Sequence, residues 1–516
     1  MLRACAKEHF SRFQDSQKRD FFNRLGQWYE HTDECFAAAK YYDKAGNWDA
    51  LLRTVGDDQG LSFGPERLAL VREWMERCPN NVILRHPEAI IVFILLLFYA
   101  RDIPQMHRYH ALLERSMELC TDLPKSKRDQ LEGEALLRLS FLCFNDISAM
   151  STYHRRIKAL LTTDRNPWTQ GSPSVLMLYH SKKGNLDYEN AEMSECMPIY
   201  SNAAGGHGSG AAIVMLGETE LMRGNFANAA IYCQQAENIA LANHEFRIYT
   251  AAEFLKARLA VYERTQNAAF DILDAAAEAL MLHNQYSLLI TIEFCRAWIA
   301  SLLGKKERIA SWIFDEDSSN AQIFPIVDPI FQVIINATLL SERKWTHIAA
   351  STPQNIKACS ASNFTLCLLY IHLQNAVAFM HMGKNADAKM SVAAAWSIAE
   401  PDGILLPFAE ADRCLDPFFS ELIDYKTGKR LRILAEQFRS ITSISDQPAL
   451  RNLTPREKEI ALLISKRNSS KEIADKLCIS VKSVNNRLNT IYEKLGLGGQ
   501  GRNKRQMLIQ LIEGEI

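Results

Sequence analysis

The chain lacks the features that would place it in a membrane or in an oxidising compartment. Its longest apolar run covers residues 89–100, whereas a membrane span needs about 18 residues or more. This run predicts a fully buried helix, and we expect no membrane partner. The N-terminus carries Arg3, Lys7 and Glu8 with no apolar segment, which predicts no signal peptide. The 12 cysteines are scattered without a Cys-x-x-Cys pair, which predicts free thiols in a reducing cytoplasm.

Motifs of catalysis and nucleotide binding are missing as well. The chain has no Gly-x-x-x-x-Gly-Lys-Ser/Thr, His-Glu-x-x-His or Gly-x-Ser-x-Gly sequence. The glycine-rich stretch 205–210 lacks a phosphate-binding lysine and predicts a flexible loop between helices. His107, His110 and Glu114 would share a helix face and could hold a metal, but an exposed polar face is the simpler interpretation. We expect no enzyme activity, no metal and no cofactor.

Strand patterns are almost absent, so the predicted fold class is all-α. A helix-ending corner recurs at Gly46-Asn47, Gly184-Asn185, Gly224-Asn225, Gly304-Lys305 and Gly383-Lys384. From 184 onward the intervals are 40, 80 and 79 residues, which is close to one and two copies of a helix pair. This spacing predicts a tetratricopeptide-like solenoid, with an irregular helical domain as the alternative. Trp168, Trp312 and Trp396 are expected in its core or groove, or alternatively as a platform for a ligand ring.

The C-terminal residues differ from the rest in charge. Residues 450–516 hold thirteen Lys and Arg against seven Asp and Glu, although the whole chain carries a net charge of −1. A local basic excess is typical of nucleic-acid binding. The pairs Thr454/Glu457 and Ser469/Glu472 have the spacing of capping boxes and predict two helix starts.

A third helix is expected after Ser480, ending at Gly496 and Gly498, with a fourth over about 504–512. The order of a short helix, a turn and a longer helix is that of a helix-turn-helix. One face of the third helix is apolar, and the other carries Lys482, Ser483, Asn485, Asn486, Arg487, Asn489 and Lys494. Cations neutralise phosphates, and Asn and Arg can bond base edges. A merely solvated face is the alternative, but the local charge favours DNA.

Four segments carry a family resemblance. Leu453-Thr454-Pro455-Arg456-Glu457, Ser470-Lys471-Glu472-Ile473-Ala474, Ile479-Ser480-Val481-Lys482-Ser483-Val484 and Ile491-Tyr492-Glu493-Lys494-Leu495-Gly496 resemble the LuxR-type helix-turn-helix. The resemblance implies a third helix in the major groove and a fourth in dimer contacts. It also implies a DNA-binding set: Ser470, Lys471, Lys482, Ser483, Asn485, Asn486, Arg487 and Lys494. Arg467-Asn468 replaces the usual glycine, and Asn468 is expected in the left-handed conformation.

The upstream chain resembles the sensor region of large MalT-like regulators. Residues 74–79 and 86–88 resemble its start, and residues 399–410 resemble its closing segment. Those regulators normally begin with an ATP-binding domain. Because this chain has no phosphate-binding loop motif, ATP-driven switching is not expected.

These observations predict a bacterial, cytoplasmic transcription regulator in four parts. An N-terminal helical segment (1–60) leads into a repeat sensor (61–425), a connecting helix and linker (426–452) and the DNA-binding domain (453–516). The expected partners are double-stranded DNA, RNA polymerase, a small-molecule or protein effector on the solenoid, and a second copy of the chain. The alternatives are a protein-binding scaffold with a degenerate DNA module, and a helical enzyme.

Overall fold

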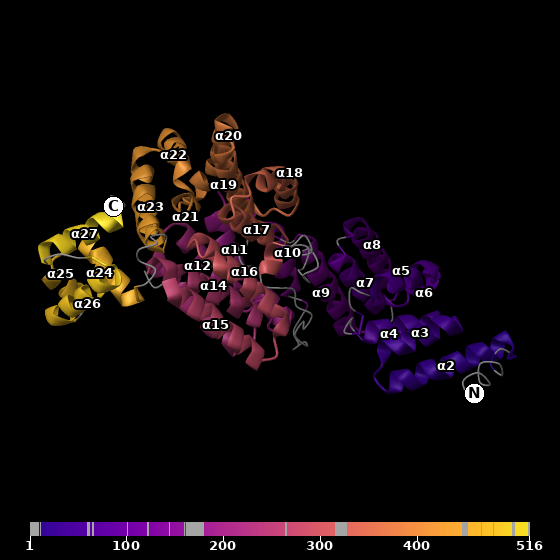
Figure 1. Ribbon diagram of the computed structural model, residues 1–516. Helices are drawn as coiled ribbons and strands as arrows, with labels where there is room; N and C mark the ends of the chain where they lie inside the picture. Colours follow the sequence, from indigo (N-terminus) through magenta and orange to yellow (C-terminus); the bar gives the residue numbers. More distant parts are fainter. Residues whose placement is uncertain are drawn as a thin grey trace.

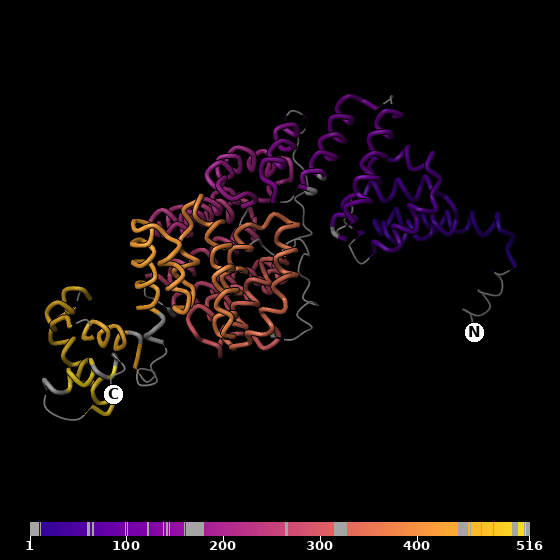
Figure 2. The backbone as a smooth tube through the Cα atoms, turned by 90° about the horizontal axis from the view of Figure 1, so that it is seen from above, coloured from indigo at the N-terminus to yellow at the C-terminus, as the bar shows by residue number. Residues whose placement is uncertain are grey.

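The computed structural model describes residues 10–513 except 11, 59–61, 64–66, 101, 121–122, 144, 159, 161–179, 264–265, 315–327, 446–452, 466, 478 and 498–500. Among the described residues every regular element is a helix and none is a strand, which confirms the predicted all-α class. Figures 1 and 2 show three groups of helices in a row, which we name the N-terminal body, the helical array and the C-terminal module.

The N-terminal body is built around one apolar helix. Its helices are α2 (Asp15–His31), α3 (Cys35–Ala45), α4 (Trp48–Asp57), α5 (Leu68–Arg77), α6 (Asn80–Ile83), α7 (Pro87–Tyr99), α8 (Ile103–Leu119) and α9 (Lys125–Leu142). Residues 89–98 of α7 are all buried, as the apolar run predicts. No helix in the described part of the chain is long and apolar enough to span a bilayer.

The helical array carries the largest core. Its helices are α10 (Ile147–Ile157), α11 (Leu186–Ala203), α12 (Ala211–Met222), α13 (Phe226–Ala242), α14 (Phe246–Tyr262), α15 (Gln266–Leu282), α16 (Leu289–Leu302), α17 (Asp328–Ser341), α18 (Trp345–Ala361), α19 (Thr365–His381), α20 (Asn385–Ala399), α21 (Leu406–Ala409), α22 (Asp416–Leu422) and α23 (Tyr425–Ser445). Short 3-10 turns lie between some of them: η2 (Tyr286–Leu288), η3 (Lys306–Arg308), η4 (Ser311–Phe314), η7 (Glu400–Asp402) and η8 (Arg413–Leu415).

Left-handed residues end the helices of the array at regular intervals. All five predicted glycines have positive φ, from 66° at Gly304 to 78° at Gly184 and Gly224. The 80-residue gaps between them contain the same corner made by other residues, namely His244, Asn284, Arg343 and Asn363. These corners therefore recur about every 20 or 40 residues, which is one helix or one helix pair. The tetratricopeptide type of the repeat remains a prediction.

The array turns back on itself, so that the segments before α10 and α11 touch the corner between α18 and α19 and the turn η7. Asn145 donates to the carbonyl of Asn363 at 2.5 Å, and the Thr365 amide donates to the carbonyl of His180 at 3.0 Å. Asp402 accepts from the backbone amides of Gly184 and Leu186 at the start of α11. In Figure 1 the magenta and orange helices accordingly lie side by side.

The described residues form three apolar cores. One core extends from Ala38 to Ala135, a second from Leu136 to Ile441, and a third from Leu453 to Leu508. Helix α23, which was expected to connect two domains, buries Leu434 and Phe438 in the core of the array. The core of the array therefore includes α23 as far as Ile441.

The glycine-rich stretch 205–210 joins α11 to α12 and is hydrogen-bonded to its neighbours. The amide of Gly208 donates to the Glu245 carboxylate at 2.8 Å, and Gly206 donates to the carbonyl of Ser201 at 2.7 Å. A Cβ atom at Gly208 would lie 2.8 Å from the Met197 methyl carbon. A protein carboxylate therefore already binds a backbone amide of this loop, and the flexibility of the loop remains a prediction.

Two of the three tryptophans singled out in the sequence pack in the core of the array. Trp396 is buried with its ring edge-to-face against Phe408, and half-buried Trp312 is edge-to-face with Phe294. Trp168 lies outside the described residues. The two described rings therefore pack against other rings of the array core.

Candidate nucleic-acid interface

The C-terminal module is a four-helix unit with its own core. Its helices are α24 (Pro455–Ser465), α25 (Ser470–Leu477), α26 (Val481–Lys494) and α27 (Gly501–Glu513). Its buried side chains include Ile460, Ile473, Val484, Ile491 and Leu508, which come from all four helices. The module therefore buries apolar surface without help from the array.

Both predicted capping boxes start their helices. The Thr454 amide donates to the Glu457 carboxylate at 2.7 Å, and the Glu457 amide donates back to the Thr454 hydroxyl at 3.4 Å. The same reciprocal pair joins Ser469 and Glu472, at 2.7 and 3.2 Å. Helix α26 has the predicted Ser480 cap, which accepts from the Ser483 amide at 3.1 Å. These side chains satisfy amides that the first helical turn leaves free.

The corner between α24 and α25 differs from the expected one. Arg467, rather than Asn468, takes the left-handed conformation, with φ of 59°. Asn468 instead bonds three partners: its side chain donates to the Leu463 carbonyl and accepts from Lys476, and its own carbonyl accepts from Arg505. The polar groups of Asn468 bond these neighbours. The left-handed conformation, which strains the backbone, is therefore taken by the preceding residue, Arg467.

Helix α26 presents a polar face opposite its core face. Val484, Leu488, Ile491 and Tyr492 are buried, at helical spacing. Lys482, Asn485, Asn486 and Arg487 are exposed. The side that would have to enter the major groove is therefore open, and it is not covered by the array.

The other predicted DNA-binding residues occupy different settings. Lys471 is exposed in the first turn of α25, and Ser470, the first residue of that helix, is half-buried. Ser483 is half-buried with its hydroxyl 2.9 Å from the Ser480 hydroxyl. Lys494 binds the Glu457 carboxylate at 2.8 Å and so ties the end of α26 to the start of α24. The structure therefore assigns a packing role to Lys494, while its DNA contact remains a prediction.

Asn489 lies on the same polar face of α26. Asn489 is exposed and follows Lys482, Asn485 and Asn486 at the spacing that keeps side chains on one side of a helix. The sequence already placed Asn489 on this polar face, although the predicted DNA-binding set leaves it out. With Asn489 the face offers three amides, which can both donate to and accept from base edges.

Helix α24 lies on the side of the module that faces the array (Figure 1). Burial lowers the pKa of Lys305, at the end of α16, and the nearby cations Arg308 and Lys458 lower it further. Lys458 lies in α24, so this helix faces the array. Figure 1 accordingly shows α24 on the array side of the yellow module.

Residues with metal-ligating groups come together at one place that sequence spacing did not reveal. Ligand atoms of His381, Asp412 and Cys414 lie within 4.8 Å of one another, and the ring of Trp345 stacks on His381 at 4.3 Å. These three residues could hold a metal ion. By contrast, of the candidate set in α8, His110 and Glu114 form a pair at 3.7 Å, without a cluster of three or more among the described residues.

Comparison with known families identifies only the module. Residues 451–502 match the family model for bacterial regulatory proteins, luxR family. The module is therefore similar to the luxR-type helix-turn-helix. This match supports a DNA-binding transcription regulator. No curated protein and no solved structure gives a match to the chain.

Proposed function

We propose that the protein is a transcription regulator in which the helical array receives a signal and controls DNA reading by the module. The observation that carries DNA reading is the exposed amide-rich and cationic face of α26, on the opposite side from its core. Lys482 and Arg487 supply charge toward phosphates or guanine, and Asn485 and Asn486 supply amides toward bases. The LuxR-type resemblance supports a dimer on a two-fold site and contact with RNA polymerase.

Control by the array is supported by the packing of α23. This helix buries Leu434 and Phe438 in the core of the array and ends at Ser445, eight residues before the module core begins at Leu453. A rearrangement of the array that moves α23 would therefore move the attachment of the module. An effector that prefers one arrangement would shift the population that can bind DNA.

The state of the cysteine thiols agrees with this function. The ten described cysteines are free thiols, and six of them are buried. Burial raises the pKa of Cys233 and of Cys359 to about 12, so these thiols stay protonated and unreactive. We place the protein in the bacterial cytoplasm, where it would meet the chromosome.

Selection of duplex DNA from a random-sequence pool by the full-length protein tests the proposal. We expect enrichment of one motif in two related half-sites, and binding that weakens steeply as salt rises. Recovery of unenriched DNA, with no salt dependence, would instead favour a protein-binding scaffold with a degenerate module.

A further inference from the structure

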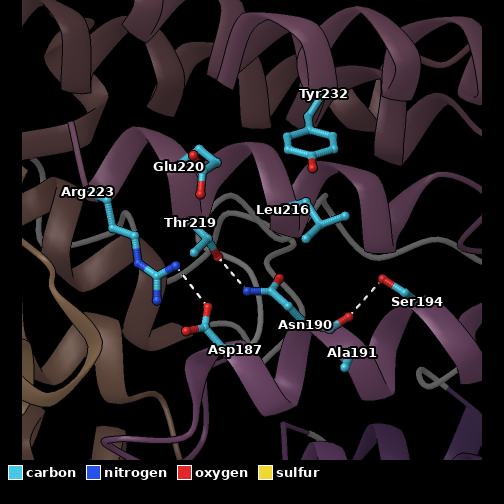
Figure 3. Close-up of a pocket in the computed structure, with 9 residues that line it drawn as sticks. All are labelled: Asp187, Asn190, Ala191, Ser194, Leu216, Thr219, Glu220, Arg223 and Tyr232. Atoms are coloured by element: carbon cyan, nitrogen blue, oxygen red, sulfur yellow. Dashed lines mark hydrogen bonds and ion pairs between the residues drawn. The ribbon is translucent and has the colours of Figure 1, made fainter. Parts of the chain in front are cut away.

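A polar cavity lies between α11, α12 and α13 of the array. Its volume is about 280 Å³, and its polar lining consists of Asp187, Asn190, Ser194, Thr219, Glu220, Arg223 and Tyr232. Figure 3 shows that the Asn190 amide, the Glu220 carboxylate and the Tyr232 hydroxyl are directed toward the space between α11 and α12. Small-molecule sites begin at about 300 Å³, so this cavity suits a small ligand.

Asn190 is the residue that marks the cavity as a binding site. It is 5% exposed, and its amide nitrogen donates to the Thr219 hydroxyl at 3.0 Å. Its carbonyl oxygen Oδ1 is buried and has no hydrogen-bond donor within the described part of the chain. A buried acceptor without a donor is unfavourable. A ligand that brings an N–H or O–H group to Oδ1 would remove that cost.

The charged groups of the cavity leave an excess of acceptors. Glu220 accepts from Asn225 and Asn228 at 3.0 and 2.9 Å, both times on Oε2, which leaves Oε1 available. Arg223 is already engaged, because Nη1 donates to Asp187 at 2.8 Å and Nε donates to the Asp402 carbonyl at 2.9 Å. Two carboxylates and one guanidinium give the lining a net negative charge.

These groups select one class of ligand. An ammonium group carries three donors, no acceptor and a positive charge, and so complements Asn190 Oδ1 and Glu220 Oε1. The ring of Tyr232 can add a cation–π contact. We propose that this cavity is the effector site of the array and takes a small molecule with a primary ammonium group. The proposal deepens the proposed function and rests on it.

Arg223 connects the cavity to the helix that leads to the module. Its side chain lines the cavity, and its backbone carbonyl accepts from Arg430 of α23 at 3.4 Å. The next residue, Gly224, packs so closely under Leu434 of α23 that a Cβ atom there would lie 2.8 Å from a Leu434 methyl carbon. A ligand that draws Asp187 away from Arg223 would therefore act on the residue next to Gly224, where α23 packs on the array.

The test uses full-length protein and two probes that differ in one group, 5-amino-1-pentanol and 1,5-pentanediol. Binding is measured by calorimetry and by the shift in melting temperature. We expect the amino alcohol to bind at least about tenfold more tightly than the diol. We expect Glu220→Gln to weaken the binding of the amino alcohol about tenfold. Glu278→Gln makes the same change on an exposed residue of α15 and should leave binding unaltered.

Equal affinity for the two probes, no binding of the amino alcohol, or full affinity in Glu220→Gln would each overturn the ammonium site. A second measurement separates this failure from that of the proposed function. The affinity of the full-length protein for its selected DNA is compared with and without the amino alcohol, with Glu220→Gln as the reference for ionic effects. A ligand-dependent change of several-fold supports the site as the effector site. Tight binding of the probe with unchanged DNA affinity would keep the site but refute control by the array.

Discussion

Arg487 and Lys471 are both exposed cations of the module, but their positions predict different tasks. Arg487 lies on α26, the helix expected in the groove, whereas Lys471 lies in the first turn of α25. We expect Arg487→Ala to cost about 1–3 kcal/mol on the selected motif and to relax preference at one base position. Lys471→Ala should weaken binding to all duplexes evenly and lower the salt slope by about one.

Titrations of both variants against the selected motif and a scrambled duplex, over a range of salt concentrations, distinguish the two roles. Each variant serves as the control for the other, because each removes a single exposed positive charge. If the two variants behaved alike on both duplexes, the assignment of α26 to the groove would be wrong.

His180 forms a buried charge cluster that should make stability depend on pH. Its ring lies 2.7 Å from the Glu189 carboxylate and 3.3 Å from that of Asp402. Burial alone would lower the pKa of His180, but the hydrogen bonds and charges of Asp402 and Glu189 outweigh burial and raise it above 6.5. The folded protein therefore holds the proton more tightly than the unfolded chain does.

The stabilisation from His180 is complete below about pH 6.5 and is lost as the pH rises through the raised pKa. We expect the free energy of unfolding, measured by urea denaturation between about pH 7 and 9, to fall with pH. His154 opposes this slope only near pH 7, where the unfolded histidine is still partly protonated, because burial lowers its folded pKa to about 4. Glu189→Gln should flatten the slope, while the exposed Glu278→Gln should keep it; an unchanged slope in Glu189→Gln would contradict the assignment.

At the scale of single elements, the tie between α24 and α26 decides what Lys494 does. Its amine lies 2.8 and 3.0 Å from the two oxygens of Glu457, which is buried and also closes the capping box of α24. The attraction of Lys494, together with bonds from Thr454, outweighs burial and lowers the pKa of Glu457. Lys494 thus holds two helices in register.

We expect Lys494→Ala to destabilise the module by about 1 kcal/mol, since the lysine is partly exposed and solvent screens the pair. Thermal melting would show this loss, and the salt slope of DNA binding should change by much less than in Lys471→Ala. A slope reduced by a full unit, with no loss of melting temperature, would instead make Lys494 a phosphate contact.

The corners between helices show which turns can be predicted from the sequence pattern alone. The five glycine corners could be predicted because glycine adopts positive φ without strain. The corners at His244, Asn284, Arg343 and Asn363 were missed, although they have the same geometry. Asn and His tolerate this conformation more often than most residues do, but they also occur in many other settings. Their identity therefore signals a corner only when the repeat length is already known.

At the scale of the whole molecule, the seat of α23 on the array is the contact through which a signal would have to pass. Leu434 fills the space over Gly224, next to the cavity residue Arg223. We expect Leu434→Ala to leave binding of the amino alcohol within about twofold, because Leu434 does not line the cavity. The same variant should reduce the effect of the ligand on DNA affinity, since the helix loses its close fit.

Ile433 provides a matched control for Leu434. It is the neighbouring residue of α23 and is 57% exposed, so Ile433→Ala removes an apolar side chain without opening the contact. Parallel DNA titrations with and without the amino alcohol compare the two variants. A response in Leu434→Ala as large as in the unmodified protein would exclude this route.

What the sequence by itself determined are properties that depend on residues near one another in the chain. Capping boxes, the apolar stripe of α26, the helix-ending glycines and the basic excess of residues 450–516 are of this kind, because helix geometry relates residues three and four apart. The tertiary structure decided the rest. It joined Asp402 to the start of α11 and brought Arg223 beneath α23. It also formed an open pocket beside Asn190 and gave Lys494 a partner 37 residues away. These contacts follow from the curvature of the array and the packing of helices. Neither can be predicted from the pattern of residues that are neighbours in the chain.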